Sequence, residues 1–90
     1  MRDVLSSGRF KRDLKRVTKQ GKDLSKLEVV IDTLAADDKL PVRMRPHKLV
    51  GQYAGLWECH IEPDWLLVYN LDDPEALKLI ATGRHADLFK

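Results

Sequence analysis

The spacing of apolar residues changes character near the middle of this 90-residue chain. Over the first 36 residues they recur every three or four positions, which is the repeat of an amphipathic helix. From residue 56 onward they alternate or run without interruption over five or six positions, which is typical of strands. Helices followed by strands predict an α+β fold, and a chain this short, residues 1–90, is expected to form a single domain.

Two helices are expected in the first part of the chain. Apolar residues at i, i+4 and i+7 predict a helix over about residues 8–20, and Gly21 follows as a typical C-terminal glycine. A second helix ends near residue 36 and begins at Asp23 or Ser25, since both are suitable N-caps. The short connection predicts a helical hairpin with antiparallel helices.

Three strands are expected in the second part. Residues 56–61 alternate, which places Glu58 and His60 on the face opposite the apolar residues. Residues 65–69 are apolar on both faces and therefore predict a central strand. Residues 76–81 predict a third strand, broken by the following glycine. Together the three form an antiparallel meander, with the helical hairpin packed on one face.

Two other segments carry weaker signals. Val4 and Leu5 indicate a short first strand before the first helix. Residues 41–52 contain two prolines and show no periodicity, so they are interpreted as a loop. The resulting fold class is an N-terminal helical hairpin packed on a small, mainly antiparallel sheet.

The net charge of +2 conceals an uneven distribution. Residues 1–26 hold nine Lys and Arg against three acids, and residues 40–48 add Arg43, Arg45 and Lys48 with no acid. Such stretches suit a polyanion such as RNA, because neutralised phosphates release counterions. A solvated helix face produces the same pattern, so the charge alone does not decide between the two.

The composition also restricts the location of the protein. No apolar run approaches the length of a membrane span, and the N-terminal residues lack the apolar segment of a signal peptide. The single cysteine, Cys59, excludes an internal disulfide and fits a reducing compartment. We therefore expect a cytoplasmic protein with no membrane contact, in which Cys59 is a small buried residue.

Three histidines lie in separate segments of the C-terminal half. In a meander the strands alternate in direction, so the end of the third strand returns to the edge where the first one ends. This topology brings Arg84 and His85 to the same edge as His60 and Asp64. His47, in the preceding loop, is within reach of that edge. Histidine exchanges protons near neutral pH, so the sequence predicts an acid–base site there.

Such a site suits RNA cleavage by the neighbouring 2′-hydroxyl. Two histidines of opposite protonation state perform the proton transfers, and a cation stabilises the phosphorane. The pattern contains neither zinc-site spacing nor a glycine-rich phosphate loop, so we expect no metal and no cofactor. Each residue also has a structural interpretation: His60 as an exposed strand residue, Asp64 as a turn former, Trp65 and Phe89 as packing residues.

Residues 45–51, 57–69 and 82–89 together resemble the YafQ branch of the RelE/ParE toxin superfamily, the toxins of type II toxin–antitoxin modules. The resemblance covers nearly the whole chain. Its most specific part is the combined spacing of His60, Pro63, Asp64, Thr82, Gly83 and His85. It implies a RelE-like fold and an mRNA interferase, an endoribonuclease that cuts mRNA in the ribosomal A site and is neutralised by a cognate antitoxin.

The resemblance also implies an active site and its division of roles. Its members are His47, His60, Asp64, His85 and Phe89. His85 is expected to be the general acid and His60 or His47 the base, with Asp64 orienting the base or sharing its task. Trp65 and Phe89 support the site or stack on a base, and Arg84 and Lys48 are candidates for RNA contact.

One departure from the family pattern affects the expected activity. The family usually has an arginine immediately before the Thr-Gly pair, where this chain has Ala81. That arginine is the expected phosphate clamp, and loss of such a contact typically lowers the rate by about a hundredfold or more. Either Arg84 supplies the charge instead, or Ala81 attenuates the toxin. The second is favoured if the strand continues, because positions 81 and 84 would then face opposite sides.

Two other function classes compete with the RNase interpretation. A non-catalytic module that binds an antitoxin or another protein would not need the histidines. A ParE-like gyrase inhibitor would not need them either, and it would provoke a DNA damage response without mRNA cleavage.

Overall fold

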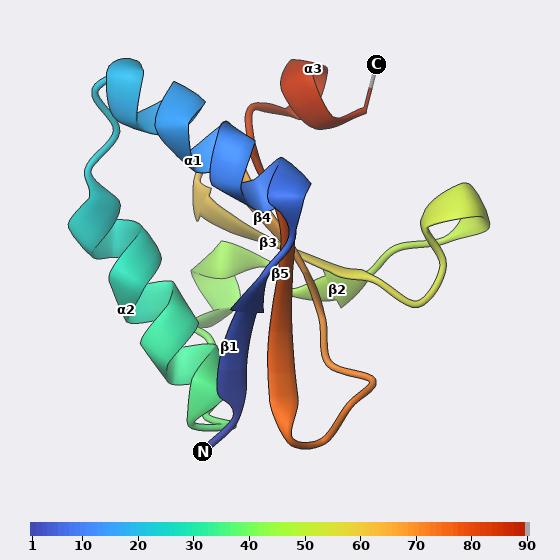
Figure 1. Cartoon of the computed structure of the whole chain (residues 1–90). Coiled ribbons are helices and arrows are strands. Elements are labelled where there is room, and N and C mark those ends of the chain that lie inside the picture. The colour runs from blue at the N-terminus through green and yellow to red at the C-terminus, as the bar shows by residue number, and fades with distance from the viewer. Residues whose placement is uncertain (90) are drawn as a thin grey trace.

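A computed structural model describes residues 1–89. Its elements are β1 (Asp3–Ser6), α1 (Gly8–Lys19), α2 (Leu24–Ala35), the 3-10 helix η1 (Val42–Met44), β2 (His47–Lys48), the 3-10 helix η2 (Gly51–Tyr53), β3 (Trp57–Glu62), β4 (Trp65–Asn70), β5 (Ala76–Gly83) and α3 (His85–Leu88). The five strands form one sheet in the order β1-β5-β4-β3-β2. Helices α1 and α2 lie on one side of it (Figure 1). The α+β class and the central position of β4 are confirmed.

The sheet extends beyond the expected meander at both edges. β1 confirms the short first strand and pairs in parallel with β5, whereas the other pairs are antiparallel. β2 lies within the segment interpreted as a loop, so that interpretation of residues 41–52 is wrong. β2 is only two residues long and follows a proline, and its pairing with β3 creates it. A strand this short has no alternation to detect.

The ends of the two helices follow from the local sequence. The Ser7 hydroxyl accepts a hydrogen bond from the backbone N–H of Phe10 and caps α1. Gly21 has a φ of 80° and closes the helix as expected. Of the two candidate caps of α2, Asp23 holds the N-cap position, and its carboxylate accepts a hydrogen bond from the N–H of Ser25.

The expected N-terminal helical hairpin packs on one face of the sheet, which confirms this part of the fold class. α1 packs mainly on β5, and α2 contacts β3 and β5. In Figure 1 the two helices diverge from their short connection, with α1 across the sheet and α2 beside it. Each helix therefore buries its apolar stripe on the sheet, where more apolar surface is available. None of the helices in residues 1–89 is long and apolar enough to span a membrane.

Both faces of the sheet are covered by apolar side chains. The face under α1 and α2 carries the larger core, which includes Phe10, Val17, Leu27, Val30, Cys59, Trp65, Leu67, Tyr69, Leu77 and Leu79. The opposite face carries a smaller cluster of Leu66, Val68, Ala81 and Leu88. A bulge opposite Val68 and Tyr69 shifts the register of β5, so Leu79 belongs to the first face and Ala81 to the second.

A buried hydrogen-bond chain ties β4 to β5. The Trp65 Nε1–H donates to the Thr82 hydroxyl at 3.0 Å, and that hydroxyl donates to the Leu66 carbonyl at 2.7 Å. The backbone N–H of Thr82 donates to the buried Asp13 carboxylate of α1 at 3.1 Å. Every group in this chain of bonds is buried. Breaking one bond would therefore destabilise the fold mainly by leaving a buried donor or acceptor unpaired.

Thr82→Val is expected to destabilise the fold by about 1–3 kcal/mol. Valine has a similar shape but leaves the Trp65 N–H and the Leu66 carbonyl without a partner. Urea unfolding followed by circular dichroism measures the loss. Thr18→Val is the matched control, since its hydroxyl bonds the Leu14 carbonyl on the exposed side of α1. Equal effects of the two substitutions would contradict the buried-bond argument.

Candidate active site

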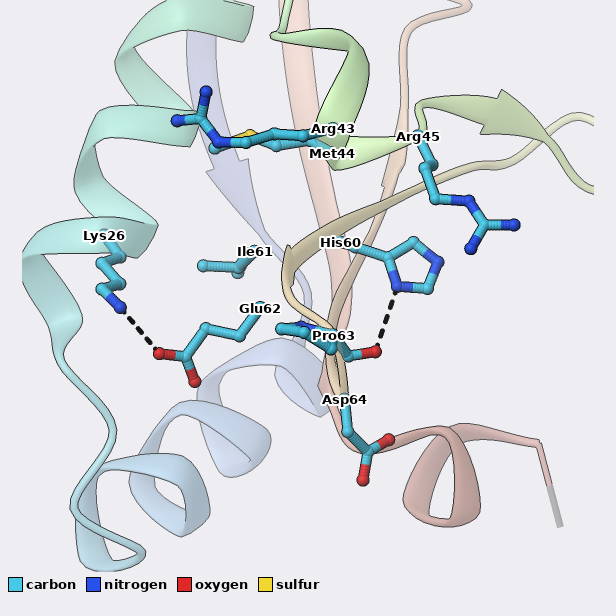
Figure 2. A pocket seen from close by; sticks show the side chains of 9 residues that line it. All are labelled: Lys26, Arg43, Met44, Arg45, His60, Ile61, Glu62, Pro63 and Asp64. Atoms are coloured by element: carbon cyan, nitrogen blue, oxygen red, sulfur yellow. Dashed lines mark hydrogen bonds and ion pairs between the residues drawn. The ribbon is translucent and has the colours of Figure 1, made fainter.

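A hollow of the described surface lies beside His60, between η1 and the β3–β4 turn (Figure 2). Its volume is about 660 Å³. The residues that line it are Lys26, Arg43, Met44, Arg45, His60, Ile61, Glu62, Pro63 and Asp64. It therefore joins two residues expected in the site, His60 and Asp64, with the basic segment that precedes β2.

His47 and His60 meet at a third residue, Glu58. His47 lies opposite Glu58 in the β2–β3 pair, and His60 is two positions along the same face of β3. The Nε2 atom of each imidazole is 3.7 Å from Glu58 Oε1. The Glu58 side chain is 8% exposed, compared with 51% for His47 and 22% for His60. The structure thus gathers His47 and His60 around a buried carboxylate.

Backbone carbonyls fix the orientation of both rings. His47 Nδ1 lies 2.8 Å from the Arg45 carbonyl, and His60 Nδ1 lies 3.3 Å from the Pro63 carbonyl. A carbonyl only accepts hydrogen bonds, so each Nδ1 carries a hydrogen. The Nε2 of each neutral ring is then the nitrogen without a hydrogen, and it faces the Glu58 carboxylate.

Glu58 is the site residue that the sequence reasoning missed. An acid on an alternating strand was assigned to the face away from the core, and nothing suggested that it would be buried. One signal was present in the sequence, because Glu58 and His60 are two positions apart on a strand and therefore share a face. A carboxylate and a histidine with this spacing are candidates for one site.

Asp64 and His85 meet at the same edge, as the topology predicted. The backbone N–H of His85 donates to Asp64 Oδ1 at 3.3 Å. Gly83 ends β5 with a φ of 152°, which favours glycine, and a Cβ there would collide with the Arg16 guanidinium. This turn lets the chain leave the sheet and start α3 at His85. Asp64 lines the same hollow as His60 and is therefore the residue shared by this pair and the hollow.

The two aromatic candidates have different environments. The Phe89 ring lies 5.0 Å from the His85 ring and 5.2 Å from that of Tyr53, measured between centroids. Phe89 therefore supports the face of the imidazole. Trp65 is fully buried in the core under the helices. It packs as its structural interpretation suggested, and in this position it has no face open to an RNA base.

The three remaining candidates differ in their surroundings. Arg84 is bound to Asp87, with Nε 3.1 Å from Oδ2, and this bond raises the pKa of the guanidinium. Lys48 points to the opposite side of β2 from His47, and its Nζ lies 5.6 Å from the centre of the Trp57 ring. Ala81 is buried on the second face of the sheet and lines a small hollow with Arg9.

Cys59 is buried on the helix side of β3, so the prediction of a structural cysteine is confirmed. Burial raises the pKa of its thiol to about 12, which leaves almost no thiolate at neutral pH. Within residues 1–89 no three His, Cys, Asp or Glu side chains are grouped closely enough to hold a metal ion.

Comparisons with known proteins place the chain in a family. The family model described as "Bacterial toxin of type II toxin-antitoxin system, YafQ" matches residues 2–90. The mRNA interferase toxin YafQ of Escherichia coli K12 is 38% identical over 89 residues, which cover 98% of this chain and 96% of that protein.

Two crystal structures extend the comparison to the fold. The E. coli DinJ-YafQ complex contains a chain 37% identical, with a TM-score of 0.90 and full coverage of both chains. A metal-bound toxin from Helicobacter pylori is 38% identical, with a TM-score of 0.92 over 99% of this chain and 100% of that one. The fold and these relatives thus define a toxin of a type II toxin–antitoxin system. Within that class, the chain belongs to the YafQ family.

Proposed function

We propose that this chain is a ribosome-dependent mRNA interferase, an endoribonuclease that inhibits translation. The observation that carries the proposal is the assembly of His47, His60, Asp64 and His85 at one end of the sheet. The name of the E. coli relative, mRNA interferase toxin, supports the same activity. The activity belongs to residues 1–90 acting as a single toxin domain.

The reaction proposed is attack by a 2′-hydroxyl on the adjacent phosphorus. A base removes the hydroxyl proton, the bond from phosphorus to the 5′-oxygen breaks, and an acid protonates that oxygen. The products are a 2′,3′-cyclic phosphate and a 5′-hydroxyl. His60 or His47 is the base, since the Nε2 of each ring is unprotonated in the neutral form. His85 is the acid, Asp64 positions it through its backbone N–H, and Glu58 stabilises the protonated base.

The partners proposed are a cognate antitoxin, mRNA and the ribosome, with no small-molecule cofactor and no metal. The E. coli DinJ-YafQ complex supports an antitoxin partner, since its toxin chain matches this one over its full length. A ribosomal target would require a cytoplasmic location, which is part of the proposal.

Position 81 shares a sheet face with the site. Ala81 pairs with Val68, Val68 with Glu58, and Glu58 with His47, so the four form a row across the sheet. An arginine at position 81 would extend over that face. Arg84 does not fill this role, because it lies beyond β5 and is bound to Asp87. Either Ala81 attenuates the toxin or a cation elsewhere in the site binds the phosphate.

Primer extension on mRNA from cells that express the chain tests the proposed activity. We expect cuts within codons of translated messages, absent from untranslated ones. Ala81→Arg is expressed in parallel. Stronger cutting by this variant would make Ala81 an attenuating residue, and equal cutting would mean that another cation binds the phosphate. Growth arrest with intact message would reject the RNase and favour a binding module, and arrest with a DNA damage response would favour gyrase inhibition.

A further inference from the structure

Arg45 lies at the junction of the hollow and the two histidines of β2 and β3. Its backbone has a φ of 50°, a left-handed conformation that costs energy for any residue with a side chain. In this conformation its carbonyl lies 2.8 Å from His47 Nδ1. The same residue lines the hollow with its side chain, which Figure 2 shows extending toward the His60 imidazole. One strained residue therefore contacts one histidine with its backbone and approaches the other with its guanidinium.

The other cations near the hollow are engaged or directed elsewhere. Lys26 Nζ lies 2.9 Å from Glu62 Oε2, and this hydrogen bond raises the pKa of the lysine. Figure 2 shows Arg43 turned toward α2, away from His60. On the far side of Asp64, Arg84 is bound to Asp87. Within residues 1–89 the Arg45 side chain makes no ion pair and no hydrogen bond to protein.

A guanidinium without a protein partner, in an open hollow that His60 also lines, is suited to bind an anion. Arginine presents several N–H groups in one plane, which match two oxygens of a phosphate. The Glu62 carboxylate is occupied by Lys22 and Lys26, and Asp64 accepts the His85 N–H. The net charge around the hollow therefore remains positive, which favours a phosphodiester next to His60.

We propose that Arg45 binds the non-bridging oxygens of the scissile phosphate and thereby performs the task of the arginine that position 81 lacks. This role rests on the mRNA cleavage proposed above. The guanidinium enters from η1, on the β2–β3 side of the site, whereas an arginine at position 81 would enter from β5. Charge that develops on the phosphorane is stabilised from this side, close to the base that accepts the 2′-hydroxyl proton.

The test compares Arg45→Gln, Arg45→Lys and the parent chain in single-turnover cleavage of mRNA on purified programmed ribosomes. Arg45→Gln is expected to cleave about a hundredfold more slowly at saturating ribosomes, while Arg45→Lys recovers part of the rate because it keeps the charge. Lys78→Gln is the matched control for the loss of one positive charge, since Lys78 is exposed at the opposite end of β5. It should cleave at the parent rate.

Two further measurements separate the possible outcomes. The affinity of Arg45→Gln for the ribosome should change little, because the substitution removes an interaction made in the transition state. NMR signals of the His47 ring should show the same tautomer in Arg45→Gln as in the parent chain. A parent chain that cleaves, together with an Arg45→Gln variant that cleaves equally well, would overturn the role of Arg45 and leave the proposed function intact. A parent chain that leaves the message intact on these ribosomes would overturn both.

Discussion

Replacing His85 with alanine is expected to lower the rate of mRNA cleavage by about a hundredfold or more. The 5′-oxygen is a poor leaving group unless it is protonated as its bond to phosphorus breaks, and we assign that proton to the His85 imidazole. Alanine keeps the backbone N–H that Asp64 accepts, so the start of α3 should persist. Single-turnover cleavage on programmed ribosomes measures the loss, and circular dichroism verifies that the variant is folded.

A sulfur-substituted RNA makes this test specific for the acid. When sulfur replaces the 5′-bridging oxygen, the leaving group departs without protonation, so His85→Ala should cleave that substrate nearly as fast as the parent chain. A variant of the proposed base, His60→Ala, should remain slow on the same substrate. A His85→Ala defect of equal size on both substrates would assign His85 to positioning or binding and leave the acid to another residue.

Trp65→Ala is expected to lower the free energy of unfolding by about 3–5 kcal/mol. The indole is fully buried in the larger core, and its removal leaves a cavity and takes away the N–H from which the Thr82 hydroxyl accepts a hydrogen bond. Small domains have only about 5–15 kcal/mol of stability, so much of the chain would unfold near physiological temperature. Thermal unfolding should show a fall in Tm on the order of 20 °C.

Two companion variants separate packing from hydrogen bonding at this position. Trp65→Phe keeps most of the apolar volume and should lose about 1–3 kcal/mol, mainly from the missing N–H. Trp57→Ala removes an indole that is only partly buried, so it should be less damaging than Trp65→Ala. A Trp65→Ala variant that is as stable as the parent yet cleaves RNA poorly would favour a direct role in RNA binding instead.

Local sequence signals predicted the elements that are stabilised locally. The stripe of Phe10, Leu14 and Val17 predicts α1, and Gly21 ends it, because helix spacing and a positive φ depend on neighbouring residues. The turn at Pro63 fixed the relation of β3 to β4. Because the strands of a meander alternate in direction, the sequence predicted that Asp64 and His85 lie close together without any knowledge of side-chain packing.

Features that depend on distant partners were not predictable. β2 exists because β3 pairs with it, and two residues carry no pattern of their own. The four residues of α3 are also too few for helical spacing to appear. Glu58 was assigned to a polar face, but the histidines on either side and the apolar cluster beside Val68 cover it. Arg45 gave no signal beyond its charge, because its left-handed backbone is imposed by the turn between η1 and β2.

The parallel pair of β1 and β5 has a consequence for biosynthesis. Asp3 leaves the ribosome long before its partner Ala76 has been translated, so this edge of the sheet closes only after about seventy further residues have been added. The nascent chain can form its helices earlier, but β5 is then missing beneath α1. His85 and Asp64 come together only after β5 has joined the sheet. The proposed site therefore forms only after the chain has been synthesised as far as His85.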